Sequence, residues 1–153
     1  MHFFSISEIH ALNTIKFYNQ GVYPKIKKKH DLKSFLISIF IAENIDIQNV
    51  SYVFCKDEFL LELNRKYLNH DTYTDVLTFT LSDRSAPINA EIYISIERVL
   101  ENSISLGIDF QEELNRVMIH GILHLCGFDD RTSKEKKIMR QKENFYLSGY
   151  RFT

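Results

Sequence analysis

The sequence has no tryptophan, only two cysteines, and no apolar stretch long enough to cross a lipid bilayer. The best candidate, FLISIFIA at residues 35–42, is too short to span one and is predicted to belong to a core helix. The opening MHFFSISEIH has neither a basic segment nor a cleavage site, so we expect no secretory signal. A secreted domain of this size usually has more cysteines than Cys55 and Cys126, so we expect a cytoplasmic protein.

An excess of charge is also missing, because the formal net charge is −1. Proteins that bind nucleic acid are more commonly basic overall. Composition alone therefore gives no argument for a nucleic-acid partner, and any such argument depends on local patches. Apolar residues make up 44% and charged residues 25%, which is typical of a globular protein and excludes a disordered chain. A length of 153 residues predicts a single domain over 1–153.

Hydrophobic periodicity predicts one compact α+β domain, in which a small mixed sheet of about four strands packs with four to five helices. Strands are predicted at 2–6, 14–23 (a strand or hairpin arm), 50–56, 75–81 and 91–96, with a polar loop over 82–90. Helices are predicted at 32–45 with Asp31 as its cap, 57–68, 96–107, 109–127 as the longest, and 132–149 with Thr132 or Ser133 as its cap. The helix at 57–68 is expected to turn one apolar face inward, formed by Phe59, Leu60, Leu63 and Tyr67.

The stretch HGILHLCGFDD at 120–130 lies at the end of the long helix predicted in the C-terminal half. Residues four apart on a helix are separated by about 40° around its axis, so His120 and His124 project side by side. Gly127 permits a positive φ, which lets the chain leave the helix and return Asp130 to the two imidazoles. Two nitrogens, one carboxylate oxygen and an open fourth position are typical of a catalytic zinc site.

Other interpretations of these residues stay open. Two helical histidines occur at this spacing by chance, and a buried histidine usually forms ordinary hydrogen bonds. Asp130 also precedes a new helix, where an aspartate often caps a turn. Cys126 projects about 160° away from His124, so we expect it in the core and not among the ligands.

The spacing is similar to that of the metalloprotease pattern H-E-x-x-H-x-x-G-x-x-H. In those enzymes the glutamate after the first histidine acts as the general base, and here that position is Gly121. Peptide hydrolysis would therefore lack its proton acceptor. Phosphodiester cleavage can use a metal that polarises an oxygen and lowers the pKa of water.

Three blocks together resemble the YbeY family of bacterial endoribonucleases, also called rRNA maturation factors. The stretch at 120–130 resembles the family signature H-G-x-L-H-L-x-G-Y-D-H, and LNRKYLNHDTYTDVLTF at 63–79 resembles L-N-x-x-Y-R-x-x-D-x-P-T-D-V-L-S-F. AEIYISIERV at 90–99 resembles the G-D-I-x-I-S block. The order and separation of the blocks match, and they cover roughly the C-terminal two-thirds of the chain.

The resemblance implies a metal-dependent endoribonuclease specific for single strands, acting in 16S rRNA 3′-end maturation and ribosome quality control. It places metal ligands at His120, His124 and Asp130, with Zn²⁺ or another divalent ion bound. It also implies the pre-ribosomal small subunit as a partner, with ribosomal proteins and an assembly GTPase, and no membrane.

The sequence departs from the family pattern at several positions. Asp130 replaces the third histidine, which adds a negative charge and is expected to lower the Lewis acidity of the metal and favour harder ions. Leu68 replaces an arginine thought to face the RNA phosphate, and Tyr73 replaces a proline. Glu91 replaces an aspartate and is expected to be structural.

Three residues are weak candidates for catalytic roles. Arg65 and Lys66 are possible substitutes for the missing arginine, although a solvated helix face is the favoured interpretation of both. Asp75 either orients a loop or metal ligand or simply caps the turn into its strand. Two basic clusters offer modest support for RNA binding, at 25–33 and 131–142, although the second also fits a solvated helix face in which Glu135 and Glu143 interleave.

Two other functions remain open. The first is a metalloprotease-like hydrolase, against which Gly121 argues. The second is a ribosome-assembly factor with a structural or vestigial metal site. The residues identify neither a general base nor the nucleophile.

Overall fold

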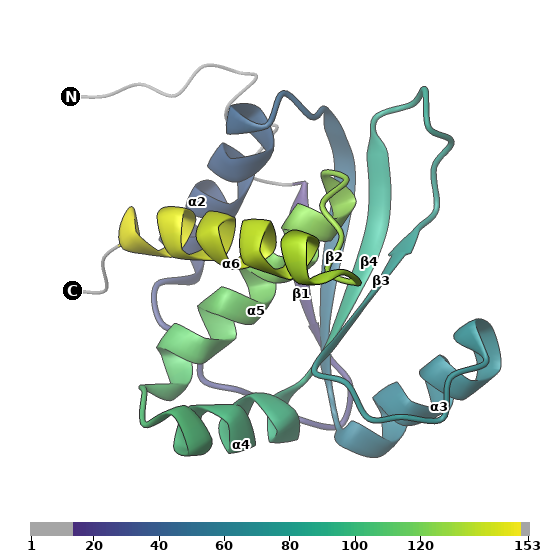
Figure 1. Cartoon of the computed structure of the whole chain (residues 1–153), viewed down its shortest axis with the longest axis vertical. Helices are drawn as coiled ribbons and strands as arrows, with labels where there is room; N and C mark the ends of the chain where they lie inside the picture. The colour runs from purple at the N-terminus through teal and green to yellow at the C-terminus, as the bar shows by residue number, and fades with distance from the viewer. Residues whose placement is uncertain (1–13, 151–153) are drawn as a thin grey trace.

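The computed structural model describes residues 14–150, so the strand predicted at 2–6 lies outside the described residues. In chain order, the elements are β1 Ile15–Asn19, α2 Lys29–Ala42, β2 Ile47–Cys55, α3 Asp57–Leu68, β3 Val76–Thr80, β4 Ile88–Ser95, α4 Ile96–Leu106, α5 Phe110–Leu125 and α6 Ser133–Ser148. These four strands and five helices confirm the predicted α+β class (Figure 1). None of the described helices is both long and apolar enough to cross a membrane.

The strands form one mixed sheet in the order β1–β2–β4–β3. β1 and β4 both run parallel to β2, while β3 runs antiparallel to β4 at the edge. A parallel partner requires a crossover connection, and α2 supplies it between β1 and β2. The segment at 14–23 therefore contains a strand that pairs with β2. The alternative of a hairpin arm stays a prediction, because the residues before 14 lie outside the described part of the chain.

The two sides of the sheet are covered differently (Figure 1). On one side, α2 and α5 pack against the strands and enclose the main core, with α6 lying across α5. Tyr52, Phe54 and Ile92 are fully buried there. On the other side, α3 packs against a smaller cluster of buried residues, Cys55, Leu60 and Leu77. We call these the α5 side and the α3 side.

The start of α2 differs from the prediction. The Lys28 carbonyl accepts a hydrogen bond from the Leu32 amide at 2.9 Å, so the first turn begins before Asp31. Lys28 is the N-cap residue, and Asp31 lies in the first turn, where its charge complements the helix dipole. The prediction that Asp31 caps this helix is therefore wrong.

β4 begins earlier than its polar sequence indicated. Ile88, Asn89 and Ala90 already pair with β2, and the Ile88 amide donates to the Asp46 carbonyl at 2.9 Å. Ladder pairing with a central strand outweighs the weak strand propensity of such residues. The loop predicted over 82–90 is therefore shorter than expected.

α3 has the predicted bounds, and three of the four residues predicted to face inward do so: Leu60 is buried in the small cluster, and Phe59 and Leu63 pack against it. Leu60, Leu61 and Asn64 are the buried residues, whereas Tyr67 is 58% exposed. The helix lies over the edge strand β3, where Tyr67 meets Phe79 edge-on and leaves most of its ring in solvent.

Candidate metal centre

α5 ends in a turn that returns the chain toward the helix. The Gly127 amide donates to the His124 carbonyl and the Phe128 amide to the Leu123 carbonyl, both at 3.0 Å. This pair of bonds is the Schellman motif, which requires a residue with positive φ after the cap. Gly127 has φ +100°, as predicted, and Phe128 packs against the core. The turn thereby brings residue 130 back over the last two turns of α5.

The three predicted ligands converge at this point. His120 Nε2 lies 3.0 Å from His124 Nε2 and 3.3 Å from Asp130 Oδ2, and His124 Nε2 lies 3.6 Å from the same oxygen. A tetrahedral ion with ligand bonds of about 2.05 Å places its ligand atoms roughly 3.3 Å apart. The observed separations match that value, and both the donor types and their spacing therefore fit one divalent ion.

Glu143 of α6 fixes the orientation of the first histidine. Its Oε2 lies 2.6 Å from His120 Nδ1, and its side chain is only 3% exposed. Burial raises the pKa of Glu143, but hydrogen bonds and charges from His120 and Arg116 outweigh it, so the net pKa is lowered. An ionised carboxylate can only accept, so Nδ1 carries a proton, and in the neutral imidazole Nε2 then has its lone pair directed at the cluster.

The two imidazoles respond differently to this environment. Burial lowers the pKa of His120, but Glu143, Asp75 and Asp130 raise it by more, so the net shift is upward. Burial and the nearby His120 lower the pKa of His124. Metal ligation requires the neutral imidazole, so of the two histidines His124 is the more readily available as a metal ligand.

Glu143 belongs to a chain of ion pairs that continues into the interior of the protein. Arg116 Nη1 donates to Glu143 Oε1 at 2.9 Å, and Arg116 Nη2 donates to Glu113 Oε2 at 2.9 Å. Glu113 is fully buried, and burial raises its pKa in spite of the arginine. Because His120 comes one turn after Arg116 on α5, both side chains contact Glu143. The ion pairs therefore hold Glu143 in position beside the first predicted ligand.

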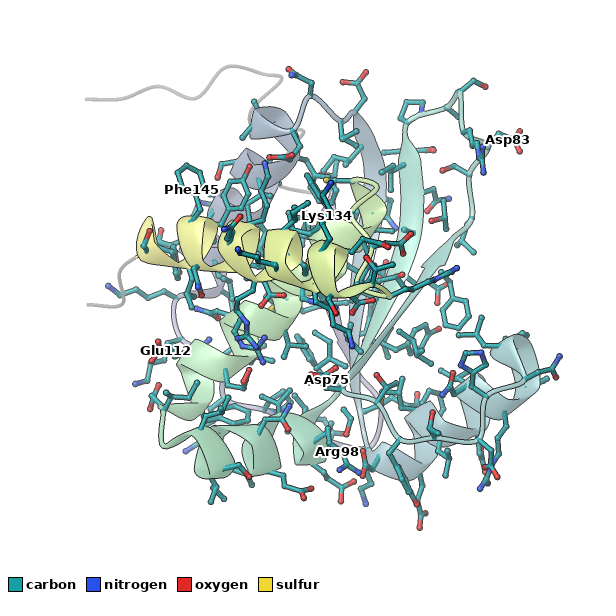
Figure 2. The ribbon with its side chains drawn as sticks, viewed as in Figure 1. Asp75, Asp83, Arg98, Glu112, Lys134 and Phe145 are labelled. Carbon is teal, nitrogen blue, oxygen red and sulfur yellow. The ribbon has the colours of Figure 1, made fainter. Side chains whose placement is uncertain are left out.

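A cleft of about 340 Å³ opens beside the cluster, between α5, α6 and the start of β3. It is lined by Asp75, Arg116, Val117, His120, Asp130, Lys136, Met139, Arg140 and Glu143. Asp75 Oδ2 accepts a hydrogen bond from Asn102 Nδ2 at 3.4 Å. Figure 2 shows Asp75 below α6, at the point where β3 begins. The candidate Asp75 therefore shares a cleft with two of the three ligands.

The two cationic candidates lie elsewhere. Arg65 pairs with Asp71 on the surface of α3, and the Lys66 ammonium lies 5.2 Å from the ring centre of Tyr67. Neither lines the cleft. Leu68, at the position of the family arginine, is 41% exposed.

Gly121 and Cys126 face away from the ligands. A Cβ atom on Gly121 would lie 2.9 Å from Ile92 Cγ2, so this residue allows α5 to approach β4 closely. Cys126 packs against the core, and burial raises the pKa of its thiol to about 12. Its position agrees with the expectation that Cys126 points into the core.

Glu143 is the residue that sequence reasoning missed. It was interpreted as an acidic residue within a solvated basic face, but it is 2% exposed. The one available signal was its spacing on α6, because Met139, Glu143 and Tyr146 repeat at helical intervals and form the buried face.

The fold and the site together define an α+β protein with a two-histidine, one-carboxylate cluster at the end of a helix. The sequence model of the family Endoribonuclease YbeY matches residues 16–151, and the chain belongs to that family.

Named relatives agree with this assignment. The chain is 40% identical over 139 residues to Endoribonuclease YbeY of Cytophaga hutchinsonii, covering 91% of this chain and 97% of that protein. It is 43% identical over 131 residues to Endoribonuclease YbeY of Christiangramia forsetii, covering 84% and 89%. The solution structure of TM1509 from Thermotoga maritima superposes with a TM-score of 0.61 at 33% identity, covering 88% of this chain and 87% of that one.

Proposed function

We propose that this endoribonuclease holds one divalent ion, Zn²⁺ in the first instance, through His120, His124 and Asp130. We further propose that the centre cleaves single-stranded RNA in 16S rRNA 3′-end maturation and ribosome quality control. The observation that supports it best is the mutual spacing of the three ligand atoms, 3.0, 3.3 and 3.6 Å. Family membership supplies the reaction class.

Each residue around the centre has a defined task. Bound there, a divalent ion would polarise a phosphate oxygen and lower the pKa of a water molecule. Glu143 holds the Nδ1 proton of His120 and keeps its Nε2 directed at the cluster. Asp75 is our candidate for accepting a proton at Oδ1, since Oδ2 already accepts from Asn102. Arg65 and Lys66 lie outside the cleft, and a catalytic role for them stays a prediction.

The choice of ion depends on the third ligand. Two imidazoles and one carboxylate suit zinc, and the carboxylate charge reduces the Lewis acidity of the ion compared with a third imidazole. Asp130→His should therefore increase the cleavage rate at neutral pH with Zn²⁺, and should weaken the preference for harder ions such as Mn²⁺.

A protease reaction is disfavoured by the packing of α5. The position where a metalloprotease has its glutamate is Gly121, whose Cβ would meet Ile92 at 2.9 Å. A carboxylate at this position would collide with the sheet and would point away from the cluster.

The deciding experiment uses a 3′-extended 16S rRNA fragment and purified wild-type, His124→Ala and Asp130→His proteins. We expect wild-type protein to cut, His124→Ala to lose bound metal and at least 100-fold of the rate, and chelator to stop cleavage. Equal cutting by all three would indicate a contaminating nuclease. Absence of cutting by all three, with retained binding to pre-ribosomes, would instead identify an assembly factor with an inherited metal site.

The end groups of the products distinguish two nucleophiles. A 2′,3′-cyclic phosphate would identify the RNA 2′-hydroxyl as the attacking group, and a linear end formed directly would identify water.

The cellular setting follows from the same proposal. We place the protein in the cytoplasm, bound to the pre-ribosomal small subunit and in contact with ribosomal proteins and an assembly GTPase. Both cysteines are free thiols, which suits a reducing compartment. Cosedimentation of tagged protein with small-subunit precursors in a gradient tests this placement, and recovery only at the top of the gradient would contradict it.

A further inference from the structure

We infer that Lys136 and Arg140 of α6 form a phosphate-binding pair that holds the RNA strand beside the metal cluster. The inference rests on the proposed function, because it concerns the substrate of the same cleft. It selects two of the basic residues of the 131–142 cluster and assigns them to one site.

The helix geometry places both side chains on the correct side of α6. At about 100° per residue, Lys136 lies roughly 20° from Glu143 around the helix axis, and Arg140 roughly 60° from it. Glu143 contacts His120 directly. Lys136 and Arg140 come two turns and one turn before Glu143 on this face, so their side chains lie farther along the cleft from the metal cluster.

The cleft itself contains both residues. Lys136 and Arg140 line it together with Asp75, His120 and Asp130. The volume of the cleft, about 340 Å³, is within the range of small-molecule sites and leaves room for part of a nucleotide.

Both cations are available for a ligand. Arg116 is held by two buried carboxylates, and Lys142 pairs with Glu43 at 3.0 Å. Within residues 14–150, by contrast, no ion pair involves Lys136 or Arg140. An unpaired arginine in a cleft can present its planar fork to a phosphate, with two parallel hydrogen bonds.

The charge balance of the cleft requires such cations. Asp75 and Asp130 line it, and Asp130 partly neutralises any bound divalent ion. Glu143 also lines the cleft, but its charge is paired with Arg116, so a phosphodiester entering beside Asp75 and Asp130 would be repelled without a further positive charge. Lys136 and Arg140 supply two charges on the wall opposite α5.

α6 also provides a matched control. Lys134 is exposed, carries the same charge, and lies about 120° from Arg140 around the helix axis. Figure 2 shows Lys134 on the upper side of α6, whereas Asp75 lies below the helix. Removing its charge changes the net charge of the protein equally without changing the cleft.

The test measures cleavage of a single-stranded RNA oligonucleotide at several KCl concentrations. It compares metal-loaded wild type with Arg140→Gln, Arg140→Lys, the double variant Lys136→Gln/Arg140→Gln, and Lys134→Gln. We expect Arg140→Gln to raise KM about 3- to 10-fold with a smaller change in kcat, because the lost contact is ionic and partly screened. The double variant should weaken the slope of log(kcat/KM) against log[KCl] by about 1.4, since each single-strand phosphate contact contributes roughly 0.7.

The controls separate charge in the cleft from charge in general. Arg140→Lys should retain the salt slope, Lys134→Gln should behave as wild type, and metal content should be unchanged in every variant. Equal KM values and slopes for Arg140→Gln, the double variant and Lys134→Gln would overturn the phosphate-binding pair.

Binding of the same oligonucleotide, followed by fluorescence anisotropy, distinguishes the two proposals. RNA binding that depends on Arg140, in a wild-type protein that never cleaves, would overturn the nuclease mechanism and support the pair. Failure of wild-type protein to bind the oligonucleotide, or equal binding by the double variant, would overturn the pair itself.

Discussion

The α5 side and the α3 side of the sheet differ in whether their charged side chains are buried. Among the described residues, the two buried carboxylates are Glu113 and Glu143, and both lie on the α5 side. Both are paired with Arg116, and one of them also contacts His120. On the α3 side, Arg65 and its partner Asp71 stay in solvent.

The aromatic residues differ in the same direction, because Tyr52 and Phe54 are fully buried on the α5 side, whereas the aromatic group on the α3 side is more exposed. Phe79 contacts Tyr67 and Tyr93 edge-on, with ring centres 5.9 and 5.7 Å apart, and the group is only partly buried. The α3 side is therefore held by ordinary apolar packing. Burying an ion is costly unless it is well paired, so the charges of the α5 side are retained where they orient a ligand. The comparison indicates that charged side chains are buried where they orient a residue of the candidate metal centre, and not throughout the core.

The largest effect expected is that of Glu143→Ala. Removing this carboxylate leaves Arg116 with Glu113 as its remaining ion-pair partner and leaves the partly buried His120 without its acceptor, which should destabilise the protein by about 3–5 kcal/mol. It should also lower metal affinity about 10- to 100-fold, because the His120 ring loses its orienting acceptor. Urea unfolding and competitive zinc titration measure the two effects.

A matched substitution on the same helix is Glu135→Ala, in the first turn of α6. Its effect should be below about 1 kcal/mol, with no change in metal affinity. If Glu143→Ala were no more harmful than Glu135→Ala, the contrast between the two sides of the sheet would be wrong.

Leu60→Ala tests the α3 side. Leu60 is 1% exposed in the small cluster, so truncation should cost about 2–5 kcal/mol by loss of burial and creation of a cavity. Metal affinity of the folded protein should remain at the wild-type value, since no ligand depends on α3. A loss of metal affinity in proportion to the loss of stability would show that the two sides are not independent.

Gly121→Ala should have an intermediate effect. The added methyl group overlaps Ile92 Cγ2, and such overpacking typically costs about 1–3 kcal/mol. The double variant with Ile92→Ala removes the opposing methyl group, so it should be less destabilised than the sum of the two single variants. Thermal unfolding of all four proteins measures this coupling, and strict additivity would exclude the close contact.

Arg65→Gln should have the smallest effect. Its ion pair with Asp71 is exposed, and exposed pairs contribute less than about 1 kcal/mol. KM for RNA should also stay unchanged, because Arg65 does not line the cleft. A rise in KM comparable to that of Arg140→Gln would restore α3 as part of the RNA-binding surface.

The sequence predicted those parts of the fold that depend on local pattern. The bounds of α3 and the turn at Gly127 follow from short-range periodicity and from the backbone freedom of glycine, and both agree with the structure. The early start of β4 was missed because its first residues are ordered by pairing with β2, a partner far away in the sequence. The first turn of α2 was missed because Leu32 bonds back to Lys28 without a capping side chain.

The candidate site was predictable to the same extent. His120, His124 and Asp130 lie within one short stretch, so their convergence could be inferred from helix geometry and one turn. Glu143 comes from another helix, 23 residues further along, and only tertiary packing brings it to His120. Asp75 reaches the cleft because β3 pairs antiparallel with β4 at the sheet edge, a topology that the sequence pattern did not specify.

The Schellman turn after α5 has a consequence for how this site can evolve. His120 and His124 are bound to the helical repeat, so neither can move without a change in the register of α5. Asp130 lies on the short connection between α5 and α6, outside both helices. A single codon change there exchanges a carboxylate for an imidazole and leaves every backbone hydrogen bond of the helices in place. Under the proposed metal binding, position 130 is thus where one ligand type can be exchanged for another without a change in either helix.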